Sequence, residues 1–344
     1  MPPISPAREV GVGVVGTGRM GAFHARTVAQ VVHGARLVAV ADPAPGTARA
    51  LTDELGGTPY TDPADLLADP AVDAVVIAAP ARLHTELVVA AAAAGKGVFV
   101  EKPMALTLAD ADRAVEAAAA AGVVLQVGFN RRFGDDFAAA RAVVADGGVG
   151  TPQLLRSLTR DPGLANPAGV RPWTIYYETL IHDFDTLRWL NPGSEVVSVY
   201  ADADALVAPD FRDAGLLDTS VVTLRFANGA FATAEASFSA AYGYDIRAEV
   251  FGSAGTVVAD GSRVGAVHRT AAGASFSTPR SDQEMFAAAY AGELAVFVDS
   301  VRRGDATGSP AAGGADARAA LAIALACIVS VQEGRRVDLA EVRA

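Results

Sequence analysis

The sequence of 344 residues predicts an α/β protein with two domains. The first is a doubly wound parallel sheet, and the second is an α+β domain built on a large, mostly antiparallel open sheet. Three observations favour this fold class. Apolar strands and amphipathic helices alternate at the start, a glycine-rich turn joins the first pair, and strand-like runs dominate after the glycines at 147–150. We therefore expect domains over residues 1–130 and 131–344, and the final helix could pack back on the first.

The alternation in the first part predicts a parallel sheet that helices cover on both faces. In such sheets ligands bind beyond the carboxyl ends of the strands, so residues that follow each strand are candidates for a site. The expected strands end near Val15, Ala41, Ala78, Val100 and Gly128, and the expected helices are 19–31, 45–55, 82–94, 107–121 and 133–146.

The glycine-rich turn, residues 16–21 (GTGRMG), lies between an apolar strand and an amphipathic helix. This is the order of a dinucleotide-binding Rossmann unit. Gly16 allows the tight turn, Gly18 lets a pyrophosphate approach bare backbone, and Gly21 lets helix and strand pack closely. The overlapping match at 11–16 is rejected, because no strand precedes it.

The expected second strand, 35–41, ends at Asp42, which lies 21 residues after Gly21. In dinucleotide-binding folds, an acidic residue about this far along the sequence hydrogen-bonds the adenosine ribose. A carboxylate accepts hydrogen bonds from a free 2′-hydroxyl and repels a 2′-phosphate, so Asp42 predicts NAD in preference to NADP. Asp42 could also cap a helix or turn before Pro43, and the two roles are compatible.

Composition excludes several classes of function. The net charge of −11 argues against nucleic acid as a partner, because phosphate binding needs a basic face. The five histidines are scattered, so we expect no metal site. The single cysteine, Cys327, predicts a buried thiol. No segment has the length and apolarity of a membrane span, and the first nine residues do not resemble a signal peptide. We therefore expect a cytoplasmic protein without a membrane partner.

The second domain shows strand-like runs with few helices, and Asn228-Gly229 is a hairpin signal. These signals predict a largely antiparallel sheet with helices on one face. Because a broad open sheet often associates through its uncovered face, we expect a homo-oligomer, either a dimer or a tetramer. The expected strands are 152–159, 195–205, 217–226, 229–238, 244–251 and 254–259, and the expected helices are 174–190, 284–303 and 313–332.

Glu178 and His182 are the first candidate pair for chemistry. On a helix they are i, i+4 neighbours, so the carboxylate can orient the imidazole and raise its basicity. An imidazole titrates near neutral pH and suits a general base. A capped helix with surface ion pairs is the alternative interpretation.

Lys102 is the second candidate. It lies between Glu101 and Pro103 at the end of an expected strand, where proline restricts the residue before it. A rigidly held ammonium there could hydrogen-bond a substrate hydroxyl and stabilise the developing alkoxide. The alternative is a solvated surface lysine.

These stretches together resemble the Gfo/Idh/MocA family of nicotinamide-dependent oxidoreductases over nearly the whole chain. The resemblance rests on GVVGTGRMG, the strand that ends at Asp42, His84, the EKP at 101–103, VGFNRRF at 127–133 and IHDFDTLRWL at 181–190. Residues 242–245, 250–256 and 332–338 resemble the inositol 2-dehydrogenase branch of that family.

The resemblance implies an NAD-dependent dehydrogenase that acts on a secondary alcohol of a cyclitol or sugar. Lys102 matches the catalytic lysine and His182 the catalytic histidine, and Glu178 takes the place of the usual aspartate. The cofactor contacts that it implies are Gly16, Gly18, Arg19, Met20, Gly21, Asp42, Ala79, His84, Glu101 and Arg131. The implied substrate contacts are Lys102, Asn130, Arg131, Thr159, Asp161, His182 and Tyr244.

Two further departures concern the substrate. Thr159 and Asp161 stand where inositol dehydrogenases that resemble this chain carry a histidine and an asparagine that hold cyclitol hydroxyls. A hydroxyl-binding site rejects a ligand that leaves its polar groups unpaired, so we expect a substrate other than myo-inositol. Two rival functions stay open on the sequence alone: a glycoside-cleaving enzyme that oxidises its sugar transiently, and an NAD-binding regulator without catalysis.

Overall fold

The structure is a computed structural model that describes residues 8–163, 170–260, 268–270, 273–275, 278–305 and 311–343. The chain divides into two compact units. The first combines residues 1–133 with 288–318, and the second combines 134–287 with 319–344. Residues 288–318, which the sequence analysis placed in the C-terminal domain, thus cluster with the N-terminal residues.

The first unit contains a six-stranded parallel sheet in the order β3-β2-β1-β4-β5-β6. This is the strand order of the doubly wound dinucleotide-binding fold, so the predicted fold class is confirmed. The strands are β1 (Val10–Val15), β2 (Ala35–Ala41), β3 (Thr58–Tyr60), β4 (Ala74–Ile77), β5 (Gly97–Val100) and β6 (Leu125–Val127). The helices between them are α1 (Arg19–Gln30), α2 (Thr47–Leu55), α3 (Pro63–Ala68), α4 (His84–Ala93) and α5 (Leu108–Ala121).

The structure shows why two glycines lie inside β1. All six residues of this strand are buried. A Cβ on Gly11 would lie 2.0 Å from the Ala71 carbonyl oxygen, and one on Gly13 would lie 2.7 Å from a Leu66 methyl carbon. These glycines therefore serve close packing within a strand, and the rejection of the glycine match at 11–16 is confirmed.

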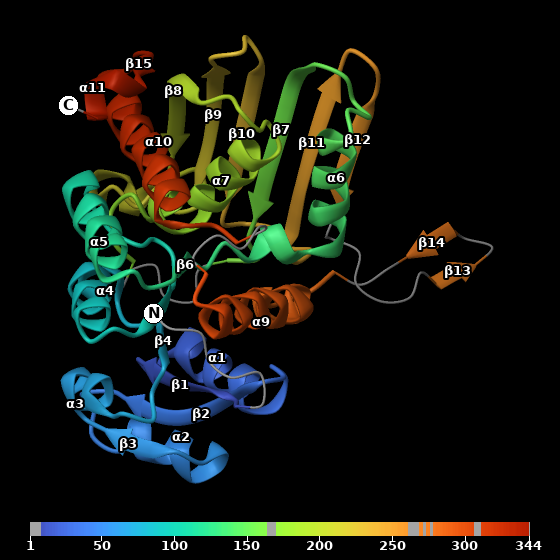
Figure 1. The fold of residues 1–344 in the computed structure, drawn as a ribbon. Helices are drawn as coiled ribbons and strands as arrows, with labels where there is room; N and C mark the ends of the chain where they lie inside the picture. The colour runs from blue at the N-terminus through green and yellow to red at the C-terminus, as the bar shows by residue number, and fades with distance from the viewer. Residues whose placement is uncertain are drawn as a thin grey trace. The chain divides into compact units, whose positions relative to one another are not determined.

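Helix α9 (Ala287–Arg303) completes the core of the first unit, although it follows six of the seven strands of the second unit's sheet in the sequence (Figure 1). Its residues Leu294, Phe297 and Val301 belong to the same buried cluster as Val12 of β1 and Phe99 of β5. The side-chain period of this segment predicts a helix, but only packing shows which sheet the helix covers.

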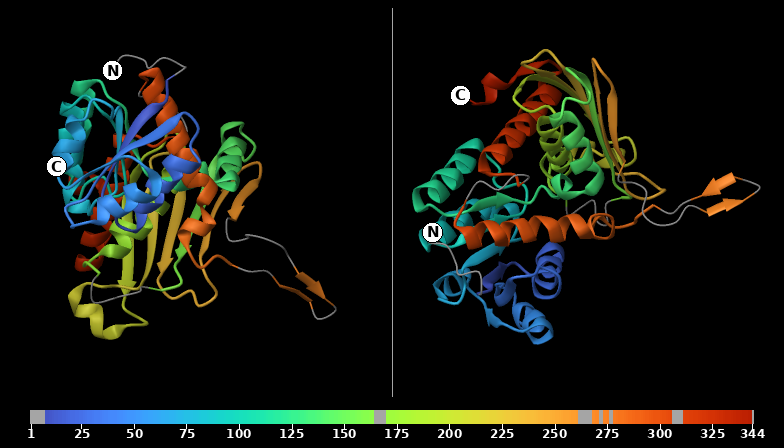
Figure 2. Two further views of the ribbon diagram at one scale, coloured as in Figure 1. Left: turned by 90° about the horizontal axis from the view of Figure 1, so that it is seen from below. Right: turned by 45° about the vertical axis from the view of Figure 1, so that its right-hand side comes forward.

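The second unit contains a seven-stranded sheet in the order β12-β11-β7-β10-β9-β8-β15. Its neighbouring strands are antiparallel except for β7 and β10. The strands are β7 (Pro152–Arg160), β8 (Val196–Asp204), β9 (Thr219–Phe226), β10 (Phe231–Ser237), β11 (Asp245–Gly252), β12 (Thr256–Asp260) and β15 (Val337–Asp338). Helices α6 (Asp135–Ala145), α7 (Ile181–Trp189) and the later part of α10 (Gly314–Glu333) lie on one face of this sheet (Figures 1 and 2).

The other face of this sheet carries a row of exposed apolar side chains. Leu154 on β7 is aligned with Phe231 on β10 and with Phe251 on β11, and their exposed fractions are 54%, 57% and 43%. The guanidinium of Arg225 on β9 stacks on the Phe231 ring at 3.9 Å. Because side chains alternate between faces along a strand, these residues point away from their buried chain neighbours Leu155, Ala232 and Val250. We call Leu154, Phe231 and Phe251 the apolar row.

Helix α10 corrects one expectation. By length and composition this helix could cross a membrane, whereas the sequence analysis found no such segment. In the structure 67% of its most apolar window is buried. The apolar run is therefore accounted for by packing inside the protein. Cys327, which lies on this helix, is buried as expected, and burial raises the pKa of its thiol well above the usual value.

Candidate active site

The glycine turn between β1 and α1 has the geometry that a dinucleotide requires. Gly16 has φ of +98°, which favours glycine, and a Cβ on it would lie 2.7 Å from the Ala78 carbonyl oxygen. A Cβ on Gly21 would lie 1.9 Å from the Gly16 oxygen. Around Gly18, by contrast, a Cβ would meet no heavy atom of the described residues within 4 Å, its chain neighbours apart. The turn is thus packed on both sides and open at its centre.

Helix α1 begins next to this opening. Its first two residues are Arg19 and Met20, and its N-cap is Gly18, which has no side chain to cap the helix. The N-terminus of a helix carries partial positive charge and backbone N–H groups that bind phosphate. The opening over Gly18 therefore suits a pyrophosphate group.

Asp42 lies directly after β2 and faces the glycine turn. One carboxylate oxygen accepts hydrogen bonds from the backbone N–H and the hydroxyl of Thr17, both at 2.8 Å. The other accepts the N–H of Ala44 at 2.8 Å. Burial raises the pKa of Asp42, but these hydrogen bonds outweigh it, so the net direction is downward and the group is ionised at neutral pH. An ionised carboxylate fits a ribose diol and opposes a phosphate.

His84 opens helix α4 and is buried between two loops that follow neighbouring strands. One ring nitrogen lies 2.7 Å from the carbonyl oxygen of Ala79, after β4, and the other lies 2.8 Å from that of Pro103, after β5. The ring therefore ties together the two loops that hold Ala79 and Lys102. Its expected contact with the cofactor stays a prediction.

Glu101 and Lys102 follow β5, and a cis peptide bond joins Lys102 to Pro103. The Glu101 carboxylate accepts the Lys102 backbone N–H at 3.2 Å and lies 2.6 Å from Nε2 of His24. Glu101 is buried, whereas Lys102 is only half-buried. The strand end thus holds the backbone of Lys102 while its side chain retains access to solvent.

Asn130 and Arg131 begin a 3₁₀ turn after β6, and each is 3% exposed. Both residues are among the cofactor or substrate contacts expected from the sequence. The first unit thus collects the expected cofactor residues at the carboxyl ends of β1, β2, β4, β5 and β6, where ligands bind in this fold. Those residues are Gly16, Gly18, Arg19, Met20, Gly21, Asp42, Ala79, His84, Glu101 and Arg131.

His182 and Glu178 lie in the second unit. The helix expected over 174–190 begins with a π-helical segment, Ile175–Leu180, and continues as α7. Glu178 belongs to the π-helical segment and is exposed, and His182 is the second residue of α7 and half-buried. A π-helical turn shifts the side chains along a helix and is frequent at functional sites. Trp173, just before it, has φ of +64°, which is rare outside glycine.

Thr159 and Asp161 lie at the end of β7, where the sequence analysis expected substrate contacts. Thr159 is buried, and its hydroxyl donates a 2.7 Å hydrogen bond to Asp183, the residue after His182. Asp161 is half-buried, and its N–H donates to the Ser237 carbonyl oxygen at 2.8 Å. Tyr244, before β11, is half-buried, and its N–H donates to the Pro279 carbonyl oxygen at 2.8 Å. Register places these segments side by side, because Arg160 pairs with both Asp245 and Ser237.

Sequence reasoning missed Asp183, His24 and Glu293. Each has no measurable exposure, and each is charged or titratable. Asp183 accepts from Ser157 at 2.5 Å as well as from Thr159. The sequence did carry a signal for such residues, which is an ionisable residue on the apolar face of a predicted helix. Residues of this kind are rarely buried unless they have a partner, so each one indicates a buried polar contact.

The fold and this set of side chains define a dinucleotide-dependent oxidoreductase. The open glycine turn, the helix N-terminus and the ionised Asp42 fit NAD, so Gly16, Gly18, Gly21 and Asp42 would hold its pyrophosphate and ribose. The nicotinamide of such a cofactor supplies hydride-transfer chemistry.

Comparison with known proteins identifies the family. An oxidoreductase family with an NAD-binding Rossmann fold, GFO/IDH/MocA, matches residues 10–129, and the GFO/IDH/MocA C-terminal domain matches residues 137–258. The chain belongs to this family, its cofactor is NAD, and the resemblance seen in the sequence is confirmed.

Three relatives are similar over nearly the whole chain. The myo-inositol 2-dehydrogenase of Thermotoga maritima is 39% identical, and the match covers 96% of this chain and 99% of the relative. The scyllo-inositol 2-dehydrogenase (NAD(+)) of Bacillus subtilis is 36% identical over 96% of each chain. A crystal structure of scyllo-inositol dehydrogenase from Lactobacillus casei with bound NAD(H) and scyllo-inositol has a TM-score of 0.91 at 27% identity, and covers 97% of this chain and 100% of that one.

Proposed function

We propose that this protein transfers a hydride between a secondary alcohol of a cyclitol, an inositol-like polyol, and NAD. The observation that carries the proposal is the likeness to inositol dehydrogenases across both units. The local geometry supports it, because each unit holds the residues that such a reaction needs in defined positions.

In the first unit, Lys102 acts on the alcohol oxygen. Its ammonium donates a hydrogen bond to the hydroxyl and stabilises the negative charge that develops as the proton leaves. Glu101 and His84 support this role, since one binds the Lys102 N–H and the other binds the next residue's carbonyl oxygen. Asn130 and Arg131 supply further hydrogen-bond donors toward the ligands.

In the second unit, His182 takes the hydroxyl proton as general base, directly or through water. Glu178 orients the imidazole in place of the family's usual aspartate. The Asp183 carboxylate, held by two hydroxyls of β7, fixes the backbone next to His182. This arrangement supports a base that keeps its orientation through the reaction.

Asp161 is the residue on which substrate choice depends most. An ionised carboxylate only accepts hydrogen bonds, whereas the amide of the inositol dehydrogenases also donates. Thr159, the other departure, already donates its hydroxyl proton to Asp183 and so offers only lone pairs. We propose that the preferred cyclitol or sugar presents hydroxyl donors toward Asp161 and Tyr244, and that it differs from myo-inositol.

The protein is proposed to be a cytoplasmic homo-oligomer, in which the apolar row meets a second copy of the chain. Exposed aromatic and aliphatic side chains aligned across three strands are typical of a protein interface. The ion pair of Arg156 with Glu235 lies on neighbouring strands of the same sheet and supplies polar contacts beside the row.

A substrate screen tests the proposed function. Purified protein is mixed with NAD and a panel of cyclitols, pyranoses and their glycosides, and the absorbance of reduced nicotinamide is followed. We expect net NADH release with a cyclitol other than myo-inositol. Best activity on myo-inositol would show that Thr159 and Asp161 carry no specificity. Cleavage of a glycoside without net NADH release would replace the dehydrogenase by the rival glycoside-cleaving enzyme.

A further inference from the structure

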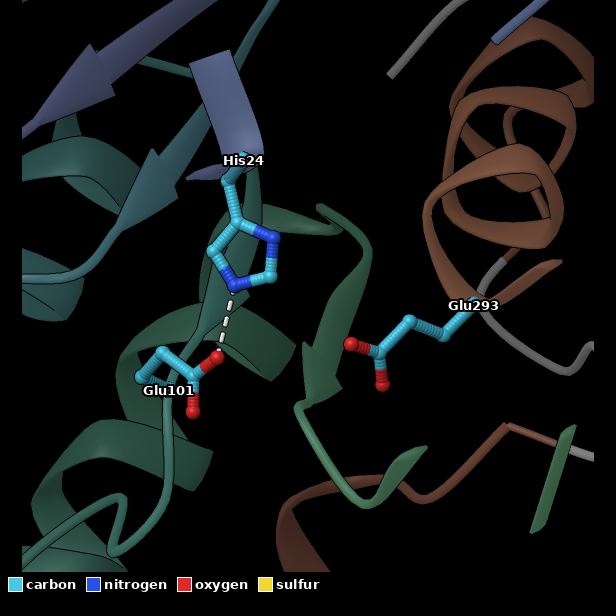
Figure 3. A group of neighbouring side chains, drawn as sticks. All are labelled: His24, Glu101 and Glu293. Atoms are coloured by element: carbon cyan, nitrogen blue, oxygen red, sulfur yellow. Dashed lines mark hydrogen bonds and ion pairs between the residues drawn. The ribbon is translucent and has the colours of Figure 1, made fainter. Parts of the chain in front are cut away.

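Three titratable side chains meet in the interior of the first unit (Figure 3). His24 comes from α1, Glu101 follows β5, and Glu293 comes from α9. His24 and Glu293 have no exposure and Glu101 is 8% exposed. One ligand-capable atom of each lies within 4.8 Å of the others. The aromatic rings of Phe99 and Tyr290 pack edge-on against His24 and keep the surroundings apolar.

Two members of this cluster form a short hydrogen bond. His24 Nε2 lies 2.6 Å from Glu101 Oε1, and Glu101 Oε2 accepts the Lys102 backbone N–H at 3.2 Å. The carboxylate is therefore held between the imidazole and the peptide that carries the lysine. Gly128 makes room for it, since a Cβ there would lie 3.3 Å from Glu101 Oε2.

The third member, Glu293, lacks such bonds. Neither of its carboxyl oxygens has a hydrogen-bond partner among the described residues, and Figure 3 shows the carboxyl group directed toward the His24–Glu101 pair. Its backbone is fixed, because Gln126 Nε2 donates to the Glu293 carbonyl oxygen at 2.8 Å. An isolated carboxylate in an apolar interior is very costly, so this group needs a cation or a proton.

The geometry favours a proton over a metal ion. Two atoms that bind one metal ion at about 2.1 Å stand roughly 3 Å or more apart in tetrahedral or octahedral sites. The 2.6 Å between His24 and Glu101 is instead the distance of a short hydrogen bond, and hydrogen bonds to charged groups are the shorter kind. His24 and Glu101 therefore share a hydrogen atom. A metal ion bound by both side chains would hold these two atoms farther apart.

The charges that face the cluster favour a proton on Glu293 rather than on Glu101. Burial raises the pKa of Glu101, but the hydrogen bond from His24 and the charges of His24, Lys102 and His84 outweigh it, and the net direction is downward. Burial and the nearby Glu101 charge raise the pKa of Glu293 well above its usual value. Tyr290, which is also titratable, packs its ring against the His24 ring.

We infer that Glu293 is a neutral carboxylic acid beside the buried His24–Glu101 hydrogen bond, and that these three side chains together position Lys102. A neutral acid places no second negative charge beside the Glu101 carboxylate, and the two residues have ligand atoms within 4.8 Å of each other. The role of the three side chains toward Lys102 rests on the proposed function, whereas the protonation of Glu293 does not. Glu293 is thus a positioning residue that acts through Glu101.

Infrared spectroscopy tests the protonation directly. The difference spectrum between wild type and Glu293→Gln at neutral pH should contain the C=O stretch of a protonated carboxyl group. A spectrum that shows only the loss of an ionised carboxylate would overturn the inference. Stoichiometric metal in the purified wild type, lost in Glu293→Gln, would overturn it as well and would assign a metal site.

The pH dependence of the melting temperature is an independent test. A carboxyl group whose pKa is raised in the folded state stabilises the fold fully below the unfolded pKa, near 4.3, and this contribution declines as pH rises toward the folded pKa. Glutamine does not titrate, so the melting temperature of Glu293→Gln minus that of wild type should increase steadily above pH 5. Glu249→Gln, at an exposed position on β11, is the matched control and should show no such increase. A pH-independent difference for Glu293→Gln would contradict the inference.

Kinetics test the positioning role. Glu293→Ala should lower kcat roughly 10-fold or more, the scale of a small misplacement of a catalytic group. Glu293→Gln, which keeps the neutral shape and a donor, should recover most of that loss, and the dissociation constant of NAD should not change in either variant. Equal losses in both variants would remove the positioning role. If no cyclitol is oxidised at all, the proposed function fails while the infrared and melting results still decide the protonation of Glu293.

Discussion

The hydroxyl of Thr159 donates a 2.7 Å hydrogen bond to Oδ2 of Asp183, and this bond ties the end of β7 to the start of α7. Ser157 donates to the other oxygen at 2.5 Å. All three side chains are buried, and 24 residues separate Thr159 from Asp183 along the chain. The residue next to Asp183 is His182, so the strand that carries the specificity candidates also fixes the backbone of the proposed base.

Replacing this hydroxyl should destabilise the protein. Thr159→Val keeps the shape but leaves Asp183 with one donor fewer, and hydrogen bonds to charged groups contribute about 1.5–3 kcal/mol. We expect the free energy of unfolding to fall by about that amount in a denaturant titration, and Thr159→Ser to restore it. Thr223→Val, at an exposed position on β9, is the control. A raised KM with unchanged stability would show that the hydroxyl serves the substrate and not Asp183.

Asp42 should control cofactor choice. Its ionised carboxylate suits a 2′-hydroxyl and repels a 2′-phosphate, so wild type should have a higher kcat/KM with NAD than with NADP. Asp42→Asn removes the charge, so it should lower the ratio of kcat/KM with NAD to kcat/KM with NADP. It also retains an acceptor for the Ala44 N–H, so it should disturb the turn less than Asp42→Ala does. Comparing kcat/KM for both cofactors is the measurement. Equal use of NADP by the unchanged protein would refute the prediction.

Lys102 should act in the transition state and not in cofactor binding. Lys102→Met is expected to lower kcat roughly 10²-fold or more, the usual scale for the loss of one donor to a developing oxyanion. Titration of the intrinsic fluorescence with NAD should give an affinity close to that of wild type. Weakened NAD binding combined with intact turnover at saturation would reassign this lysine to the cofactor.

His182 should give the reaction its pH dependence. An unprotonated imidazole accepts the hydroxyl proton, so kcat/KM for alcohol oxidation should rise with pH and then level off. His182→Ala should remove this rise and most of the rate. Glu178→Gln should slow the reaction and move the rise to lower pH, because a nearby carboxylate favours the imidazolium form. If the rise persists unchanged in His182→Ala, another group takes the proton.

The apolar row should mediate self-association. Leu154→Asp or Phe231→Asp places a charge on the exposed face of the second sheet, where burial against another chain would be costly. Light scattering after size exclusion should show these variants shifted toward the single-chain mass of 35.1 kDa. Val143→Asp, on the exposed side of α6, is the control and should leave the assembly intact. An unchanged mass in both sheet variants would place the contact elsewhere.

The sequence was sufficient for the order of the elements and for the residues at the strand ends. Helices and strands have different side-chain periods, so α1, α5 and β9 were recognisable within a few residues of their observed bounds. The short strand β3 was missed, because three residues carry too little periodicity. The π-helical segment was read as part of one α-helix, because the side-chain pattern over 174–190 does not distinguish the two helix types.

The sequence by itself determined the parallel sheet, the glycine turn and the place of Asp42 and Lys102 after their strands, because the alternation of strand and helix periods and the glycine spacing can be read along the chain. Tertiary structure alone decided that α9 packs on the first sheet and that Glu293 meets Glu101, 192 residues earlier in the chain. It also decided that Asp183 lies on Thr159. The physical reason is that periodicity records which face of an element is buried, whereas the partner of a buried charge depends on which distant element covers that face.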